Sequence, residues 1–288
     1  MDLRHNVSAR WSRLKITKDD KTVYDSGDEG LNKYQSMPGF ALDLAWSPDS
    51  AHLAYRQITS IRIINTDGKV TNQLPVSKDS AVSSFSWIDT TSVLVVSKKT
   101  ENPLDMFGKP YQYSGYTDKA MDIRIQRLPL TGGGTELYQQ VVRKPTFIFH
   151  SIGFLLDEIS PKGDLVAFSD GANLCIFDTK VGKVSRKIAI PQKPPPKVEP
   201  MEEDWPEVRK AMEELAAEPQ QLEGIWWQTH DRLVIGVGFL GSEVRSVYTY
   251  DIPSNTLTDK TSTLLPLWMG SIKARFYQDP NWFGASIK

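Results

Sequence analysis

A hairpin pattern recurs five times along the chain, and this repeat constrains the fold more than any other feature. In each copy an apolar or aromatic run ends at a short polar turn, and an apolar run follows. Pro, Asp, Asn and Gly dominate these turns because they preset or tolerate the backbone angles of a tight turn. The copies are AWSPDSAHLAY (45–55), SFSWIDTTSVLVVS (84–97), LLDEISPKGDLVAFSD (155–170), GIWWQTHDRLVIGVG (224–238) and KARFYQDPNWFGASIK (273–288).

A second hairpin accompanies each of the first four copies. These segments alternate in hydrophobicity on both sides of a turn, as antiparallel strands do. The turns lie at 67–68, 132–134, 182 and 253–255. The fifth copy has no companion before the C-terminus, but RLKITKDDKTVYDSG (13–27) near the N-terminus has the same form. The chain is therefore expected to hold four complete four-stranded units and a fifth built from two strands of each terminus.

Four-stranded sheets repeated radially form a β-propeller. We predict an all-β fold: a five-bladed β-propeller in one domain over residues 1–288, with one blade closed between the N- and C-termini. Closure of the ring removes the free sheet edges at the seam. The alternatives are a sandwich of about twenty strands or two stacked domains. The predicted blades span about 41–75, 81–140, 151–189, 222–262, and 271–288 together with 11–27.

Charge balance and cysteine content narrow the possible functions. Lys and Arg number 34 against 35 Asp and Glu, a formal net charge of −1, and no basic stripe stands out. Nucleic-acid binding is therefore not expected. No apolar run reaches the ~18 residues that a membrane span needs. The single cysteine, Cys175, lies in a strand pattern and can form no intrachain disulfide.

The stretch AWSPDSAHLAYRQITSIRIINTDGK (45–69) resembles the TolB-type, or WD40-like, propeller repeat. Trp46, Ser47, Pro48 and Asp49 match the motif, while Ser50 stands where glycine is usual; SPKG (160–163) is a weaker match. The resemblance implies the architecture but no chemistry. By analogy with periplasmic TolB it implies a bacterial, periplasmic protein, with the cytoplasm as the alternative. Peptidases with such propellers carry a G-x-S-x-G motif, which this sequence lacks.

Two long irregular segments are expected on one face of the ring, where loops between second and third strands and connections between blades both open. Segment 98–120 joins the second and third strands of the second blade, and segment 191–221 links the third and fourth blades. Aromatic residues are enriched at protein interfaces, although those of 98–120 could instead cover the blades. We predict that another protein binds this face through Met106, Phe107, Tyr111, Tyr113, Tyr116, Trp205 and Met212.

A catalytic alternative rests on carboxylates near the central channel. A five-bladed glycosidase, or a protein that binds a small ligand, would use a pair of carboxylates on the innermost strands. Asp43, Asp157 and Glu223 lie near the starts of such strands, but at different distances from the turns. The four histidines show no metal-ligand spacing, and no motif calls for a cofactor. The sequence therefore favours a non-catalytic interaction propeller.

Overall fold

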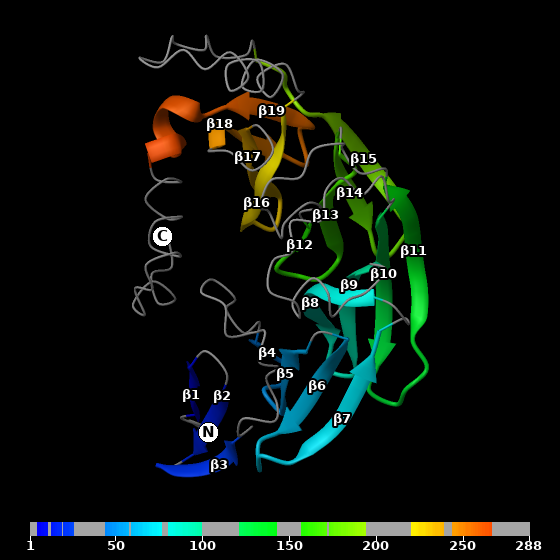
Figure 1. Cartoon of the computed structure of the whole chain (residues 1–288), viewed down its shortest axis with the longest axis vertical. Helices are drawn as coiled ribbons and strands as arrows, with labels where there is room; N and C mark the ends of the chain where they lie inside the picture. Colours follow the sequence, from blue (N-terminus) through cyan, green and yellow to red (C-terminus); the bar gives the residue numbers. More distant parts are fainter. Residues whose placement is uncertain are drawn as a thin grey trace, which may run out of the picture.

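The computed structural model describes residues 5–10, 13–18, 20–25, 44–57, 59–76, 80–99, 121–142, 157–171, 173–193, 220–238 and 244–266. Within these ranges the strands form four four-stranded antiparallel sheets and one three-stranded sheet. The four larger sheets lie side by side along an arc (Figure 1). This confirms an all-β, propeller-like arrangement, and we call the four sheets blades one to four in chain order.

Each blade consists of four strands that follow one another in the chain and run from the inside of the arc to its outside. Blade one holds β4 (Leu44–Trp46), β5 (His52–Arg56), β6 (Ser60–Asn65) and β7 (Val70–Pro75). Blade two holds β8 (Ser80–Asp89), β9 (Ser92–Lys99), β10 (Met121–Pro129) and β11 (Thr135–Val142). Blade three holds β12 (Asp157–Ile159), β13 (Leu165–Ser169), β14 (Asn173–Asp178) and β15 (Lys183–Ala189). Blade four holds β16 (Gln221–Thr229), β17 (Arg232–Gly238), β18 (Val244–Asp251) and β19 (Thr256–Asp259).

The core is divided into layers between neighbouring sheets. Successive side chains of a strand point to opposite faces, so a central strand that is apolar throughout fills two layers. In β13, Ala167 packs toward blade four, whereas Val166 and Phe168 pack toward blade two. The continuous apolar runs of the sequence are therefore explained by burial on both faces.

Tryptophan side chains tie neighbouring blades together near the inner turns. The indole Nε1 of Trp87 in β8 donates to the carbonyl oxygen of Ala45 in β4, at 2.9 Å. Trp227 in β16 makes the corresponding bond to the carbonyl oxygen of Glu158 in β12, at 3.2 Å. Blade three has Ile159 at this position of the repeat. Its junction with blade two therefore lacks the indole hydrogen bond, and Ile159 packs in the apolar layer between the two blades.

The serine of the Ser-Pro turn has the same role in blades one and three. The Ser47 hydroxyl accepts the backbone N–H of His52 at 2.9 Å, and the Ser160 hydroxyl accepts that of Leu165 at 3.0 Å. The fourth residue of each turn has a left-handed backbone, with φ of 71° at Gly163 and 59° at Ser50. Ser50 is therefore a side-chain-bearing residue at a position that suits glycine.

We expect Ser50→Gly to raise the free energy of unfolding by about 0.5–1 kcal/mol, because a left-handed backbone costs an L-residue more than glycine. Denaturant unfolding measures the change, with Ser50→Ala as the control that keeps a Cβ atom. The reciprocal Gly163→Ser should be destabilising, since a Cβ atom there would lie 3.0 Å from the Trp87 carbonyl oxygen. An unchanged unfolding midpoint in Ser50→Gly would contradict the expectation.

The outermost strands of blades one to three share a β-bulge at the third residue after the turn, whereas β19 of blade four pairs with β18 without a register shift. Thr71 in β7, Leu137 in β11 and Ser185 in β15 each have no directly opposite residue on the neighbouring strand. Two of them bond through the bulge, since the hydroxyls of Thr71 and Ser185 donate to the carbonyl oxygens of Ile63 and Ile176. The bulge thus recurs in three of the four blades.

The N-terminal sheet lies at one end of the arc, beside blade one (Figure 1), and holds β1 (His5–Arg10), β2 (Arg13–Lys18) and β3 (Lys21–Asp25). The predicted pairing of 13–17 with 21–25 is confirmed. Val23 in β3 is bulged in the same way as the outer strands of blades one to three. Ile16 packs with Leu53 on the face of blade one that is turned away from blade two. Segment 13–25 thus has the form and position of an outer hairpin.

Strand β1 was not predicted. It pairs with β2 along the edge that a blade shared between the termini would offer to the C-terminal hairpin. The prediction overlooked it because HNVSAR shows little apolar alternation. Residues 271–288 lie outside the described residues, and among the described strands no sheet joins the two ends of the arc. Five blades and ring closure therefore stay predictions.

Candidate partner-binding face

Both long insertions leave the sheets at the same end of the strands. The chain leaves β9 after Lys99 and returns at Met121, and it leaves β15 after Ala189 and returns at Gln221. In an antiparallel blade, second and fourth strands end where first and third strands begin. We call this end the insertion face, and the opposite end, with the inner turns, the turn face. The first insertion starts slightly later than expected because β9 extends to Lys99.

A pair of glutamines closes the base of the second insertion. The Gln192 side-chain amide accepts the backbone N–H of Gln220 at 2.8 Å and donates to its carbonyl oxygen at 3.1 Å. In return, the side-chain oxygen of Gln220 accepts the backbone N–H of Lys193 at 3.3 Å. These bonds form a neck, which holds the two ends of segment 194–219 together beside blade four.

Lys193 attaches the neck to blade four. Its ammonium lies 3.1 Å from Asp259 Oδ2 and 5.6 Å from the centre of the Tyr248 ring. Hydrogen bonds from Thr261 and the contact with Lys193 lower the pKa of Asp259 to about 2. The hydrogen bond to Asp259 in turn raises the pKa of Lys193. The pair is exposed and contributes little to stability, but it fixes where the insertion leaves the blade.

A buried polar cluster lies between blades two and three, near the end of β9. The Asp157 carboxylate accepts the Ser83 hydroxyl at 2.5 Å and the Ser84 hydroxyl, and it lies 2.7 Å from the Lys98 ammonium. Its side chain is only 1 % exposed. A bulge at Ser83 in β8 brings two consecutive hydroxyls to the same carboxylate. This cluster is a polar tie between blades two and three, at the end of the strands opposite to the inner turns.

Blade one also reaches this cluster. The Arg56 guanidinium at the end of β5 donates to the carbonyl oxygen of Ser83 at 2.7 Å. The bulged residue is thus held by its hydroxyl to blade three and by its carbonyl to blade one. Polar contacts among three blades converge on Ser83 next to the start of the first insertion.

The geometry of Asp157 does not suit a general acid or base. A catalytic carboxylate must reach the substrate, whereas this one is buried and engaged by three donors. Asp43 lies outside the described residues, and of Glu223 only the backbone, in β16, is described. The aromatic and methionine residues expected to bind a partner also lie outside the described residues, namely Met106, Phe107, Tyr111, Tyr113, Tyr116, Trp205 and Met212.

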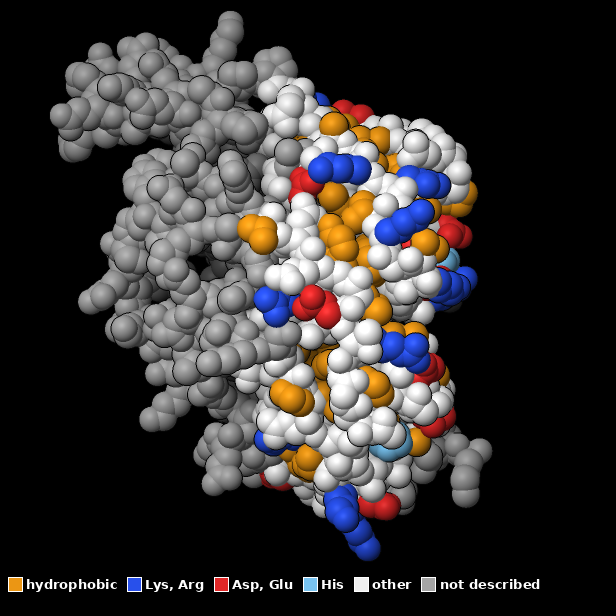
Figure 2. All heavy atoms as spheres, turned by 90° about the vertical axis from the view of Figure 1, so that its right-hand side faces the viewer, with side chains coloured by type: hydrophobic (Ala, Val, Ile, Leu, Met, Phe, Trp, Pro, Cys, Tyr) orange, Lys and Arg blue, Asp and Glu red, His pale blue; other side chains and the backbone are white. Residues whose placement is uncertain are grey.

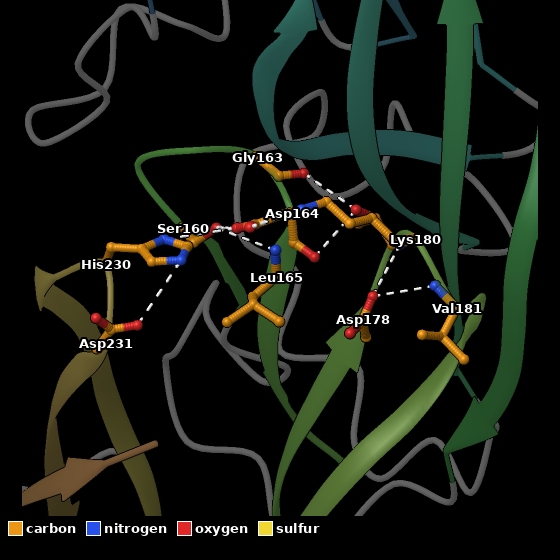
Figure 3. A network of polar contacts seen from close by, with 10 residues as sticks. Ser160, Gly163, Asp164, Leu165, Asp178, Lys180, Val181, His230 and Asp231 are labelled. Carbon is orange, nitrogen blue, oxygen red and sulfur yellow. Dashed lines mark hydrogen bonds and ion pairs between the residues drawn. The ribbon is translucent and has the colours of Figure 1, made fainter. Parts of the chain in front are cut away.

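The turn face carries a separate polar network (Figure 3). His230 Nδ1 lies 3.5 Å from Asp164 Oδ1, which connects the inner turns of blades four and three, and His230 Nε2 lies 3.8 Å from Asp231. The Ser160 hydroxyl donates to Asp164 at 3.0 Å. In the described part of the chain, no group of three or more His, Cys, Asp or Glu side chains could hold a metal ion. The contact between His230 and Asp164 joins the inner turns of blades four and three.

No helix among the described residues is long and apolar enough to cross a membrane. No protein-family model matches the chain, and no curated protein sequence is similar to it. Among the solved structures with a similar arrangement of strands are three at 9–15 % sequence identity. They are an oligogalacturonate lyase in complex with manganese, the WD40 β-propeller domain of Doa1 and the WD40 domain of SCAP from fission yeast.

The extent of these similarities is limited. TM-scores are 0.45 for the lyase and 0.42 for each WD40 domain. The matches cover 86 %, 82 % and 90 % of this chain, in the same order, but only 61 %, 58 % and 56 % of the solved chains. The chain thus spans less than two thirds of the length of each.

Proposed function

We propose that this protein is a non-catalytic propeller that binds another protein through its insertion face. The observation that carries the proposal is topological. Both long insertions leave the blades at the same end of the strands, although loops connect strands at both ends. A rigid scaffold that presents loops on one face is a common basis of recognition. The aromatic residues of the first insertion, Tyr111, Tyr113 and Tyr116, supply side chains that are enriched at interfaces.

The arrangement beneath the insertions supports the same proposal. The neck fixes both ends of segment 194–219 through Gln192 and Gln220. The Asp157 cluster anchors Lys98 directly before the first insertion. Anchored loop ends lower the entropy lost when a loop orders on a partner. The burial of Asp157 argues against the channel-carboxylate alternative.

The test is removal of segment 194–219, with Lys193 joined to Gln220 by a short Gly-Ser linker. Because the neck already holds these two residues together, the blades should keep their unfolding midpoint. We expect the shortened protein to recover much less partner in a pull-down from cells of the source organism. A separate deletion of 101–119 tests the first insertion.

The matched control changes the turn face instead. The inner turn of blade four lies at the opposite end of the strands, and its residue Asp231 is exposed. Asp231→Ala therefore alters the turn face and leaves both insertions intact. Partner recovery that falls in this control, but not in either deletion, would place the interface on the turn face. We also propose a periplasmic location, on the TolB-type resemblance; a signal sequence upstream in the gene would support it.

A further inference from the structure

The outer rim of blade three is basic, unlike the rims of the other blades. Strand β15 carries three cations, whereas β7, β11 and β19 carry no Lys or Arg. From the first residue of β14 to the last of β15, four cations stand against Asp178, a formal charge of +3. In Figure 2, which looks onto the rim, Lys and Arg side chains gather in the upper half. The basic rim is defined as Lys180, Lys183, Arg186 and Lys187.

Two of these cations are partly neutralised by blade three itself. The Lys187 ammonium lies 2.7 Å from Asp170, and that of Lys180 lies 3.6 Å from Asp164. Lys183 and Arg186 are exposed on the outermost strand. Lysines on edge strands commonly prevent pairing with another sheet. Here, however, the other outer strands do without them, so edge protection alone does not explain why blade three differs.

The chain supplies a segment of opposite charge next to this rim. Segment 194–219 holds eight acidic residues against three basic ones, a formal charge of −5. It begins directly after Lys193, four residues beyond the end of β15, and the neck returns it to the same place. Half of its 26 residues can span roughly 40 Å when extended, and β15 is roughly 23 Å long. The whole rim is therefore within reach.

We propose that segment 194–219 docks on the basic rim of its own chain. Attachment at both ends gives the segment an effective concentration in the millimolar range, so individually weak surface ion pairs are enough to hold it. A separate acidic protein would have to displace it. This inference does not depend on the proposed function, because it concerns contacts within one chain.

Carbodiimide cross-linking of the full-length protein, read by peptide mass spectrometry, tests the docking directly. Lys183 and Lys187 should form amide links to carboxylates of segment 194–219, and the Lys193–Asp259 pair, at 3.1 Å, is the internal positive control. Mixing unlabelled and nitrogen-15-labelled protein distinguishes links within a chain from links between copies. A link between Lys193 and Asp259 without any link between the basic rim and segment 194–219 would overturn the proposal. Links that form only between two copies of the chain would also overturn it.

A charge variant provides the second measurement. In Lys183→Gln/Arg186→Gln, cleavage of segment 194–219 by a glutamate-specific protease should speed up about fivefold at low salt. The difference should vanish in about 1 M salt, which screens exposed charges. The matched control, Lys69→Gln/Lys162→Gln, removes two exposed cations away from the rim and should leave the rate unchanged. Equal cleavage rates in wild type and both variants would contradict the docking.

Discussion

Replacing Asp157 with Ala is expected to lower the free energy of unfolding by about 3–5 kcal/mol. The carboxylate is buried and accepts the Ser83 and Ser84 hydroxyls and the Lys98 ammonium. Removal of one acceptor would take a bond from three donors in an environment where water cannot fully replace it. Chemical denaturation monitored by tryptophan fluorescence measures the effect.

An exposed ion pair of similar length provides the control for Asp157→Ala. The Asp89 carboxylate lies 2.8 Å from the Arg127 guanidinium, and their side chains are 40 % and 46 % exposed. Asp89→Ala should cost about 1 kcal/mol or less from loss of this ion pair, plus the loss of two turn hydrogen bonds that the backbone N–H and the hydroxyl of Thr91 donate to Asp89. If the two substitutions prove equally mild, the cluster does not tie blade three to blade two.

Gly68→Ala is expected to detach the N-terminal sheet from blade one and to lower the free energy of unfolding by about 3 kcal/mol. Gly68 lies in the turn between β6 and β7 with φ of 79°, and a Cβ atom there would lie 1.7 Å from the Val23 carbonyl oxygen. Backbone cannot yield as a side chain does, so β3 must move away. The contact of Ile16 with Leu53 and the hydrogen bond between Tyr24 and Tyr55, at 3.0 Å, should weaken with it.

Gly182→Ala separates the clash with Val23 from the cost of placing alanine in a left-handed backbone conformation. Gly182 occupies the corresponding turn of blade three with φ of 72°, but its added Cβ atom would meet nothing within 4 Å. This control should lose only the ~1 kcal/mol of a left-handed alanine. Deletion of 1–27 should cost at least as much as Gly68→Ala. If deletion of 1–27 leaves the melting temperature unchanged, the N-terminal sheet does not pack stably on blade one, and the predicted five-bladed ring is wrong as well.

The sequence predicted those parts of the fold that local chemistry determines. The turns at 47–50 and 160–163 have their own hydrogen-bonding serine, so each inner hairpin can be recognised from a few neighbouring residues. Alternation then places the paired outer strands, including 13–17 with 21–25. These signals predicted the four-stranded sheets and their order within each blade.

Features that depend on distant residues were not predicted. Asp157 looked like a channel carboxylate because nothing near it in the chain indicates that Ser83 and Ser84, more than seventy residues earlier, would meet it. Ile159 in place of tryptophan was a signal that the junction differs, but its meaning requires the neighbouring blade. The pairing of β1 with β2 was missed for a similar reason. A weakly apolar strand has little pattern of its own, and its pairing depends on the neighbouring strand.

The repeated bulge of the outer strands bears on how this protein avoids aggregation. An exposed sheet edge is a template on which another copy can extend the sheet, and propagation of that step leads to fibres. The bulges at Thr71, Leu137 and Ser185 interrupt the hydrogen-bonding pattern near the start of β7, β11 and β15. Duplication of a blade that carries the bulge would duplicate this safeguard, so a propeller could gain such blades without gaining regular exposed edges.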